Sequence, residues 1–240
     1  GWQLLFGDDE GIFYCVRRGD GRCTWRKSAT HSFAARKAHA YQAPLEANGI
    51  AYTADAEGNL YGVDIRSGKT KLSLYLRGRP TAPPALMGNC LFVATRPIFS
   101  GEASRLHAIE LDGTRRWHRD LPAQPSSVLT VNRETVFVGG DFGVQSFSVA
   151  NGQPNWVAPL DGRKIVGNAA LGLSELHVTS TEDVLTLELR TGAVRWWRRV
   201  GSKGIPGIVR AASELWGTSA GTLLAWDAKT GDPAARIPVP

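Results

Sequence analysis

Residues 184–196 read Val-Leu-Thr-Leu-Glu-Leu-Arg-Thr-Gly-Ala-Val-Arg-Trp. Apolar and polar side chains alternate up to the Thr191-Gly192 pair, and a period of two is the signature of a β-strand. Glycine in such a position supplies the positive φ that a tight hairpin turn needs. The segment therefore predicts a β-hairpin whose second strand carries Trp196.

The same pattern recurs along the chain of 240 residues. The other copies cover residues 12–25, 60–72, 106–117, 144–156 and 223–235. Their turn glycines fall about 40 residues apart, at Gly68, Gly113, Gly152, Gly192 and Gly231. A further strand is expected before each of copies two to six, over residues 42–47, 81–86, 127–131, 167–171 and 207–211. Four strands in a repeat of about 40 residues are typical of a β-propeller blade.

The predicted fold is all-β, a β-propeller of six blades in a single domain over residues 1–240. The repeats are expected at about 1–40, 41–80, 81–125, 126–166, 167–204 and 205–240. The first repeat begins with its second strand near residues 3–6, so the first blade lacks an inner strand. Two explanations stay open: a closed ring with one three-stranded blade, or part of a larger ring in a longer chain. An irregular β-sandwich is the alternative fold.

The best-preserved copy, Leu224-Ala-Trp-Asp227-Ala-Lys-Thr-Gly231, resembles the PQQ-like propeller repeat. That family includes quinoprotein dehydrogenases, the outer-membrane assembly factor BamB and propeller domains fused to bacterial kinases. The resemblance implies that the recurring tryptophan packs between neighbouring blades. The side chains at this position, interpreted as structural, are Trp25, Trp117, Trp156 and Trp196.

No catalytic, cofactor or metal site is predicted. The quinone enzymes of the family use a disulfide between adjacent cysteines and a calcium ion, and this chain has no adjacent cysteine pair. Gly217-Thr-Ser219-Ala-Gly221 matches the nucleophile elbow Gly-x-Ser-x-Gly, but it lies between two strand patterns, where that motif needs a following helix. The five histidines show no metal-ligand spacing. We therefore expect a protein that is not an enzyme and uses no cofactor.

Arg18-Gly19-Asp20 is interpreted as a hairpin turn, and it is not taken as an adhesion motif. Cys15 and Cys23 flank this turn, so the strand register decides whether their thiols face each other.

Charge is the strongest functional signal. The net charge is +6, and basic residues are concentrated in the segments that join one blade to the next. Acidic residues are concentrated in the turns between the second and third strands of each blade, and both sets are expected on one face. One interpretation is a basic socket for an acidic segment or a phosphate-bearing group. The other is that the neighbouring loops neutralise each other.

The residue set predicted to contact a partner combines these basic residues with the apolar tip of the loop over residues 95–105. Its members are Arg36, Lys37, Arg77, Arg79, Ile98, Phe99, Arg163, Lys164 and Lys203. Exposed apolar residues at a loop tip often mark a partner site.

The favoured function is recognition or scaffolding of a protein or peptide, of acidic character, as part of a larger bacterial protein. The alternative is a ligand-sensing domain, such as that of a receptor-type Ser/Thr kinase, and a propeller enzyme is the third hypothesis. Nucleic acid is not expected, because the basic residues do not form an uninterrupted track. No apolar run approaches the length of about 18 residues that a membrane-spanning helix needs.

Overall fold

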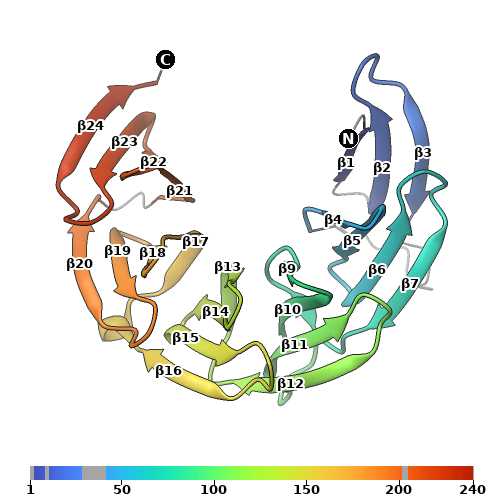
Figure 1. Ribbon diagram of the computed structural model, residues 1–240, viewed down its shortest axis with the longest axis horizontal. Coiled ribbons are helices and arrows are strands. Elements are labelled where there is room, and N and C mark those ends of the chain that lie inside the picture. The colour runs from blue at the N-terminus through green and yellow to red at the C-terminus, as the bar shows by residue number, and fades with distance from the viewer. Residues whose placement is uncertain (1–2, 9–10, 29–41, 202–204, 240) are drawn as a thin grey trace. The chain divides into compact units, whose positions relative to one another are not determined.

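The computed structural model describes residues 3–8, 11–28, 42–201 and 205–239, which form antiparallel β-sheets and one short 3-10 helix. Contacts divide the chain into two compact units, residues 1–121 and 122–240. Each unit contains three sheets, whose strands follow one another along the chain (Figure 1). The all-β prediction is confirmed, and the assignment of all 240 residues to one domain stays a prediction.

The first unit begins with a three-stranded sheet, so the described part of the first repeat has no inner strand. Its strands are β1 (Gln3–Gly7), β2 (Ile12–Arg17) and β3 (Cys23–Ser28). The second sheet comprises β4 (Leu45–Ala47), β5 (Ile50–Ala54), β6 (Asn59–Asp64) and β7 (Thr70–Tyr75). The third comprises β8 (Arg79–Pro80), β9 (Ala85–Met87), β10 (Cys90–Arg96), β11 (Ser104–Glu110) and β12 (Arg115–Leu121).

The second unit consists of three four-stranded sheets in chain order. The first comprises β13 (Pro125–Val131), β14 (Thr135–Gly140), β15 (Gly143–Ser148) and β16 (Pro154–Ala158). The next follows the 3-10 helix η1 (Leu160–Gly162) and comprises β17 (Ile165–Leu171), β18 (Glu175–Ser180), β19 (Asp183–Glu188) and β20 (Val194–Arg199). The last comprises β21 (Ile208–Ala211), β22 (Glu214–Ser219), β23 (Thr222–Asp227) and β24 (Pro233–Pro238). Strand β17 packs beside β13 and also beside β21.

One expected strand is broken in two. The pattern predicts a strand over residues 81–86, and the structure instead has β8 before this stretch and β9 at its end, both paired with β10. Pro83 and Pro84 lie between them. A proline has no N–H to donate, so a sheet ladder cannot run through the pair uninterrupted.

Each tryptophan position lies opposite a small or slender side chain on the neighbouring strand. Trp117 on β12 faces Ala108, and Trp156 on β16 faces Ser146. Because directly opposite residues of an antiparallel pair share one face of the sheet, the small residue leaves room for the indole.

In the first unit, Trp25 joins the first sheet to the second. Trp25 lies against Gly68 of the second sheet, where an added Cβ would come 2.9 Å from the indole Cγ. The indole Nε1 donates a hydrogen bond of 2.8 Å to the carbonyl oxygen of Ile65. Gly68 has φ +69°, so this position needs glycine both for its backbone conformation and for the space above it.

The Gly-x-Ser-x-Gly stretch connects two strands, as its place between two strand patterns indicated, and it forms a hairpin turn. Ser219 ends β22 and pairs with Thr222, which begins β23. The two residues between them, Ala220 and Gly221, have φ values of 50° and 73°. Positive φ at both positions is the geometry of a two-residue type I′ turn, so no nucleophile elbow forms here.

Candidate functional site

Two short strand segments bring arginines together at one edge of the third sheet. Arg79 on β8 lies directly opposite Arg96 at the end of β10, and both side chains are exposed. Arg77, also exposed, precedes them with φ 56°. We call Arg77, Arg79 and Arg96 the arginine edge. Like charges directly opposite each other destabilise an antiparallel pair.

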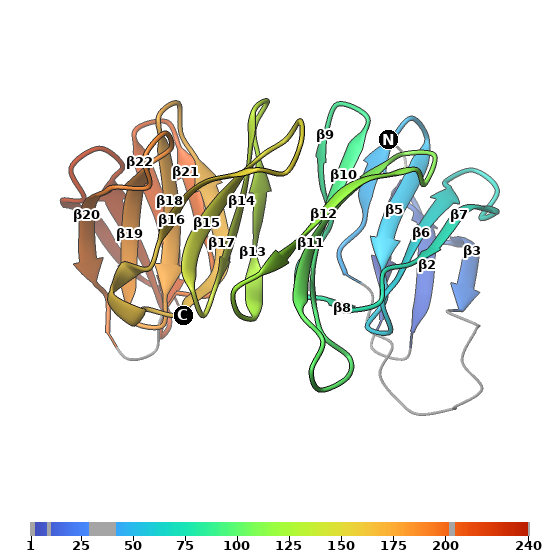
Figure 2. The same ribbon diagram turned by 90° about the horizontal axis from the view of Figure 1, so that it is seen from below.

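An exposed aromatic side chain adjoins the arginine edge. The loop from residue 97 to residue 103 connects β10 with β11 and projects beyond β8 (Figure 2). Phe99 in this loop is 66% exposed, and Ile98 beside it is half-buried. Among the described residues, no carboxylate forms an ion pair with an arginine of the edge. The site therefore combines uncompensated positive charge with an accessible aromatic ring.

In the second unit, the predicted basic residues have acidic partners. Arg163 follows η1, and its Nε donates a hydrogen bond of 3.0 Å to Asp183 Oδ2. This hydrogen bond is the main reason that the pKa of Arg163 is raised above its ordinary value. The guanidinium also lies over the ring of Trp197, 5.0 Å from its centroid.

Two further basic residues of this unit are compensated in the same way. Lys164 Nζ lies 2.9 Å from Asp141 Oδ1, and Arg199 pairs with Glu182. Arg163, Asp183, Trp197 and Arg199 line a polar pocket of about 300 Å³. In the described part of the second unit, Arg163 and Lys164 therefore follow the second interpretation of the charge pattern, mutual neutralisation by neighbouring loops.

Acidic residues of the first unit hold turns together. Asp55 is buried, and its carboxylate accepts hydrogen bonds from the backbone N–H groups of Glu57 and Asn59 and from the hydroxyl of Tyr61. Asp8 accepts hydrogen bonds from the Ile12 N–H and the Tyr14 hydroxyl. Neither carboxylate forms an ion pair with Arg77, Arg79 or Arg96 among the described residues.

Two buried histidines were not singled out from the sequence. His107 Nε2 lies 3.1 Å from Thr95 Oγ1, and His177 Nδ1 lies 2.7 Å from Thr186 Oγ1. Burial lowers the pKa of His107 to about 3 and that of His177 to about 4. Both rings are neutral at neutral pH and closed off from solvent, so they serve the core of their sheets. Both histidines stand at positions of the alternating strand pattern that face the core. This pattern in the sequence could have identified them as buried.

The cysteines are free thiols. Cys15 pairs with Trp25 across β2 and β3, whereas Cys23 pairs with Val16. This register places Cys15 in the core and leaves Cys23 exposed, so the two thiols do not face each other. Within the residues that the structure describes, no group of three or more His, Cys, Asp and Glu side chains is arranged to hold a metal ion.

Three residues of the predicted partner set lie outside the described residues: Arg36, Lys37 and Lys203. The structure places Arg77 and Arg79 at β8 and Ile98 and Phe99 in the loop after β10, all in the first unit, and places Arg163 and Lys164 in the second. Arg96 belongs with the first group and was missed, because only the register of β8 against β10 brings it opposite Arg79.

A comparison of the sequence with known protein families agrees with the repeat pattern, the tryptophan contacts and the four-stranded sheets. The sequence profile described as outer membrane protein assembly factor BamB matches residues 8–235. The chain belongs to this family. The BamB family match extends over both units, and the predicted resemblance to the PQQ-like, BamB-like repeat is confirmed.

Solved structures agree with the BamB family assignment. BamB from Moraxella catarrhalis is similar, with a TM-score of 0.73 and 17% identity over 98% of this chain and 73% of that one. The computationally designed Ika8 protein has a TM-score of 0.67 and 14% identity over 98% of this chain and 84% of that one. At these identities the likeness shows the fold. A comparison with curated proteins finds no match. Among the described residues, no helix has the length and apolar character needed to cross a membrane.

Proposed function

We propose that this BamB-family chain is a recognition or scaffold domain with no catalytic reaction of its own. It binds a protein segment with acidic and apolar side chains at the arginine edge and Phe99. The observation that carries the proposal is the exposed like-charged pair of Arg79 and Arg96 beside the exposed ring of Phe99.

The chemistry of this surface supports a protein partner. An uncompensated cross-strand arginine pair weakens its own sheet, and an acidic partner removes that cost when it binds. Arginine and aromatic residues are also enriched among the side chains that contribute most to protein interfaces. The family description, an assembly factor, supports the same class of partner.

The test begins by finding the partner through the site itself. A photoreactive phenylalanine analogue at position 99 of the full chain is cross-linked in an extract of the native source. The cross-linked protein is then purified, and its Kd is measured for the wild-type chain and for Phe99→Ser, Arg79→Glu and Arg96→Glu. We expect each variant to bind at least about tenfold more weakly, as for central interface residues.

Matched controls keep the result specific. Leu173→Ser removes an exposed apolar residue that is 97% accessible, and Arg190→Glu reverses an exposed charge, both in the second unit. We expect both controls to bind as the wild type does. Equal affinity of Phe99→Ser, Arg79→Glu and the wild type would overturn the proposal.

A ligand screen separates this function from a sensor or an enzyme. The melting temperature of the chain is measured with metal ions, sugars and quinones, because a ligand that binds the native state raises the apparent stability. We expect no rise with any of them. A saturable rise, about 2.7 kcal/mol at a hundredfold excess over Kd, would favour ligand sensing or catalysis instead.

A further inference from the structure

A small pocket of the second unit lies against one face of the sheet formed by β17, β18, β19 and β20. On this face, Asp183 lies directly opposite Arg199, and Leu185 lies directly opposite Trp197. Residues two positions apart on a strand point to the same side, so the four side chains share this face. Arg163, from the segment after η1, lies over the ring of Trp197, 5.0 Å from the ring centroid. The resulting pocket of about 300 Å³ is at the lower end of the range for ligand sites.

The turn that borders the pocket has a strained backbone. Leu160, Asp161 and Gly162 follow one another with φ values of 55°, 53° and 75°. Positive φ is uncommon outside glycine, and for a bulky residue such as leucine it is an outlier. The buried side chain of Leu160 packs in the core of the unit and holds the turn in this conformation. Strained residues are concentrated at binding and active sites, and this turn carries Asp161 into the lining of the pocket.

Every charged side chain that lines the pocket is paired with another of opposite charge. The Oδ2 atoms of Asp161 and Asp183 lie 3.1 and 3.0 Å from nitrogens of Arg163. Glu182 pairs with Arg199 in the same way. A charged group that entered would compete with one of these pairs and leave a charge without its partner. The pocket therefore favours an uncharged occupant.

Two groups of the pocket remain accessible to a ligand. Trp197 is 47% exposed, although Arg163 lies over its ring. The exposed side chain of Asp161 binds Arg163 through Oδ2, while its Oδ1 accepts no hydrogen bond from a described residue. The pocket therefore offers an aromatic surface beside a free acceptor. Together they match an uncharged ring that bears a hydrogen-bond donor.

We propose that this pocket binds the side chain of a tyrosine from a separate partner protein. The tyrosine ring packs against the indole of Trp197, and the phenol hydroxyl donates a hydrogen bond to the carboxylate of Asp161. Tyrosine combines an uncharged planar ring with a hydroxyl, and it is enriched among the central residues of protein interfaces. The inference rests on the proposed function in one respect only, that the occupant belongs to a protein. The pocket and the arginine edge lie in different units.

The probe is N-acetyl-tyrosinamide, titrated into the full chain and followed by the backbone amide NMR signals of Thr181 and Glu182, which line the pocket. We expect saturable shifts with a Kd of about a millimolar, because a single side chain supplies only part of an interface. N-acetyl-phenylalaninamide, which has the ring without the hydroxyl, should bind about fivefold more weakly, the equivalent of one hydrogen bond. N-acetyl-lysinamide and methyl glucoside should cause no saturable shift, because the first is charged and the second has no aromatic ring.

Trp197→Ala tests the ring contact. We expect it to weaken binding of both aromatic probes by at least about tenfold, because the surface against which their rings pack is lost. The matched control is Val194→Ala, at another exposed apolar side chain of β20 that does not line the pocket. We expect the control to bind both probes as the wild type does.

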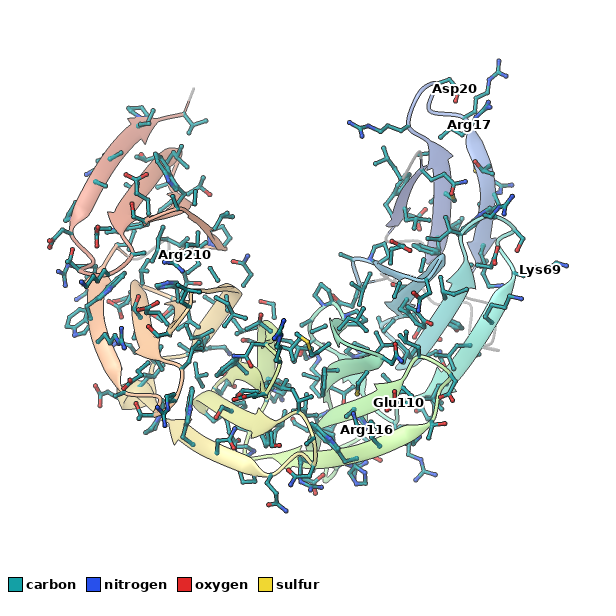
Figure 3. All side chains as sticks on the ribbon, in the orientation of Figure 1. Arg17, Asp20, Lys69, Glu110, Arg116 and Arg210 are labelled. Atoms are coloured by element: carbon teal, nitrogen blue, oxygen red, sulfur yellow. The ribbon has the colours of Figure 1, made fainter. Side chains whose placement is uncertain are left out.

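Asp161→Gly tests the hydrogen bond, since glycine suits the positive φ at this position and removes the carboxylate. We expect it to weaken binding of the tyrosine probe about fivefold and to leave the phenylalanine probe unchanged, whereas a general disturbance of the pocket would weaken both. The matched control, Glu110→Gln, neutralises another carboxylate that is paired with an arginine. Glu110 Oε1 lies 3.2 Å from Arg116 Nε on the third sheet (Figure 3). This control should change neither titration.

No saturable shift with the tyrosine probe would overturn the inference, as would equal binding of the two aromatic probes or saturable binding of methyl glucoside. Equal losses in Trp197→Ala and Val194→Ala, or unchanged binding of the tyrosine probe by Asp161→Gly, would do the same. This outcome is distinguishable from that of the proposed function. Weaker partner binding by Phe99→Ser together with no binding of the tyrosine probe would leave the arginine edge standing and remove the tyrosine pocket alone.

Discussion

Arg77 and Arg79 of the first unit and Arg163 and Lys164 of the second come from the same segment of the repeat, yet their surroundings differ. Arg79 and Arg96 face each other with no described acidic partner. Arg163 holds Asp183 and Asp161, and Lys164 holds Asp141. The same excess of basic residues is therefore paired with carboxylates in one unit, whereas in the other it forms the surface that we propose for binding.

The difference is whether a carboxylate also reaches a basic side chain. In the first unit, Asp55 and Asp8 accept hydrogen bonds from their own turns. In the second, Asp183 is free to take the guanidinium of Arg163 in addition to the hydroxyl of Ser180. A count of charges along the chain is therefore insufficient to identify a basic binding site.

The largest expected effect is a loss of stability in acid. It is caused by the buried histidines in the sheets that carry the two surfaces. Unfolded histidine takes up a proton near pH 6.5, whereas folded His107 and His177 do so only near pH 3 and 4. As the pH falls below about 6.5, the unfolded state binds more protons and stability is lost. We expect each histidine to cost about 2 kcal/mol at pH 4.5 relative to pH 7, measured by urea unfolding.

Single substitutions test whether the buried histidines cause this loss of stability in acid. His177→Gln should reduce the acid-induced loss in the second unit, while His118→Gln, at an exposed position, should keep the full loss. Equal unfolding free energies of the wild type at the two pH values would contradict the assignment.

The next effect concerns the basic residues of the second unit, whose charges are compensated by nearby carboxylates. Asp183→Asn should lower the unfolding free energy of the second unit by about 2 kcal/mol, because Asp183 is only 10% exposed and its loss leaves Arg163 without its main partner. The control, Asp161→Asn, removes the other carboxylate on Arg163, which is 93% exposed, and should have little effect. Equal losses in the two variants would show that burial does not decide the strength of the pair.

A smaller effect, of opposite sign, is expected at the arginine edge. Arg79→Glu places an acid directly opposite Arg96 and should raise the unfolding free energy by about 0.5 kcal/mol, measured by denaturant unfolding. Arg77→Glu, which has no such register partner, should not. A gain in stability together with a loss of partner binding is the result expected of a residue kept for recognition. A loss of stability would mean that the two arginines do not oppose each other.

The smallest effect is expected at the exposed pair of the second unit. Lys164 and Asp141 are 59% and 42% accessible, and such ion pairs contribute about 0–1 kcal/mol. Lys164→Ala should therefore change the melting temperature by about a degree or less, with little dependence on salt. A change as large as that of Asp183→Asn would contradict the distinction between surface and half-buried pairs.

Much of the fold could be predicted from local patterns. The alternation around Thr191-Gly192 predicts β19 and β20, and the type I′ turn at Ala220-Gly221 excludes a nucleophile elbow. The hydrophobic pattern alone does not predict the break between β8 and β9. Pro83 and Pro84 are the residues of the sequence that indicate it. The candidate site was predicted only in part, since Arg96 is missing from the sequence-based set.

The amino-acid sequence by itself determined the repeat, the hairpins and the tryptophan positions, because strand alternation and turn chemistry act between residues close together in the chain. Tertiary structure decided which charges meet and which histidines are buried. Those properties depend on strand register and on contacts between sheets, such as Trp25 on Gly68, and join residues about 40 positions apart. A contact over that distance is settled only when the sheets have packed.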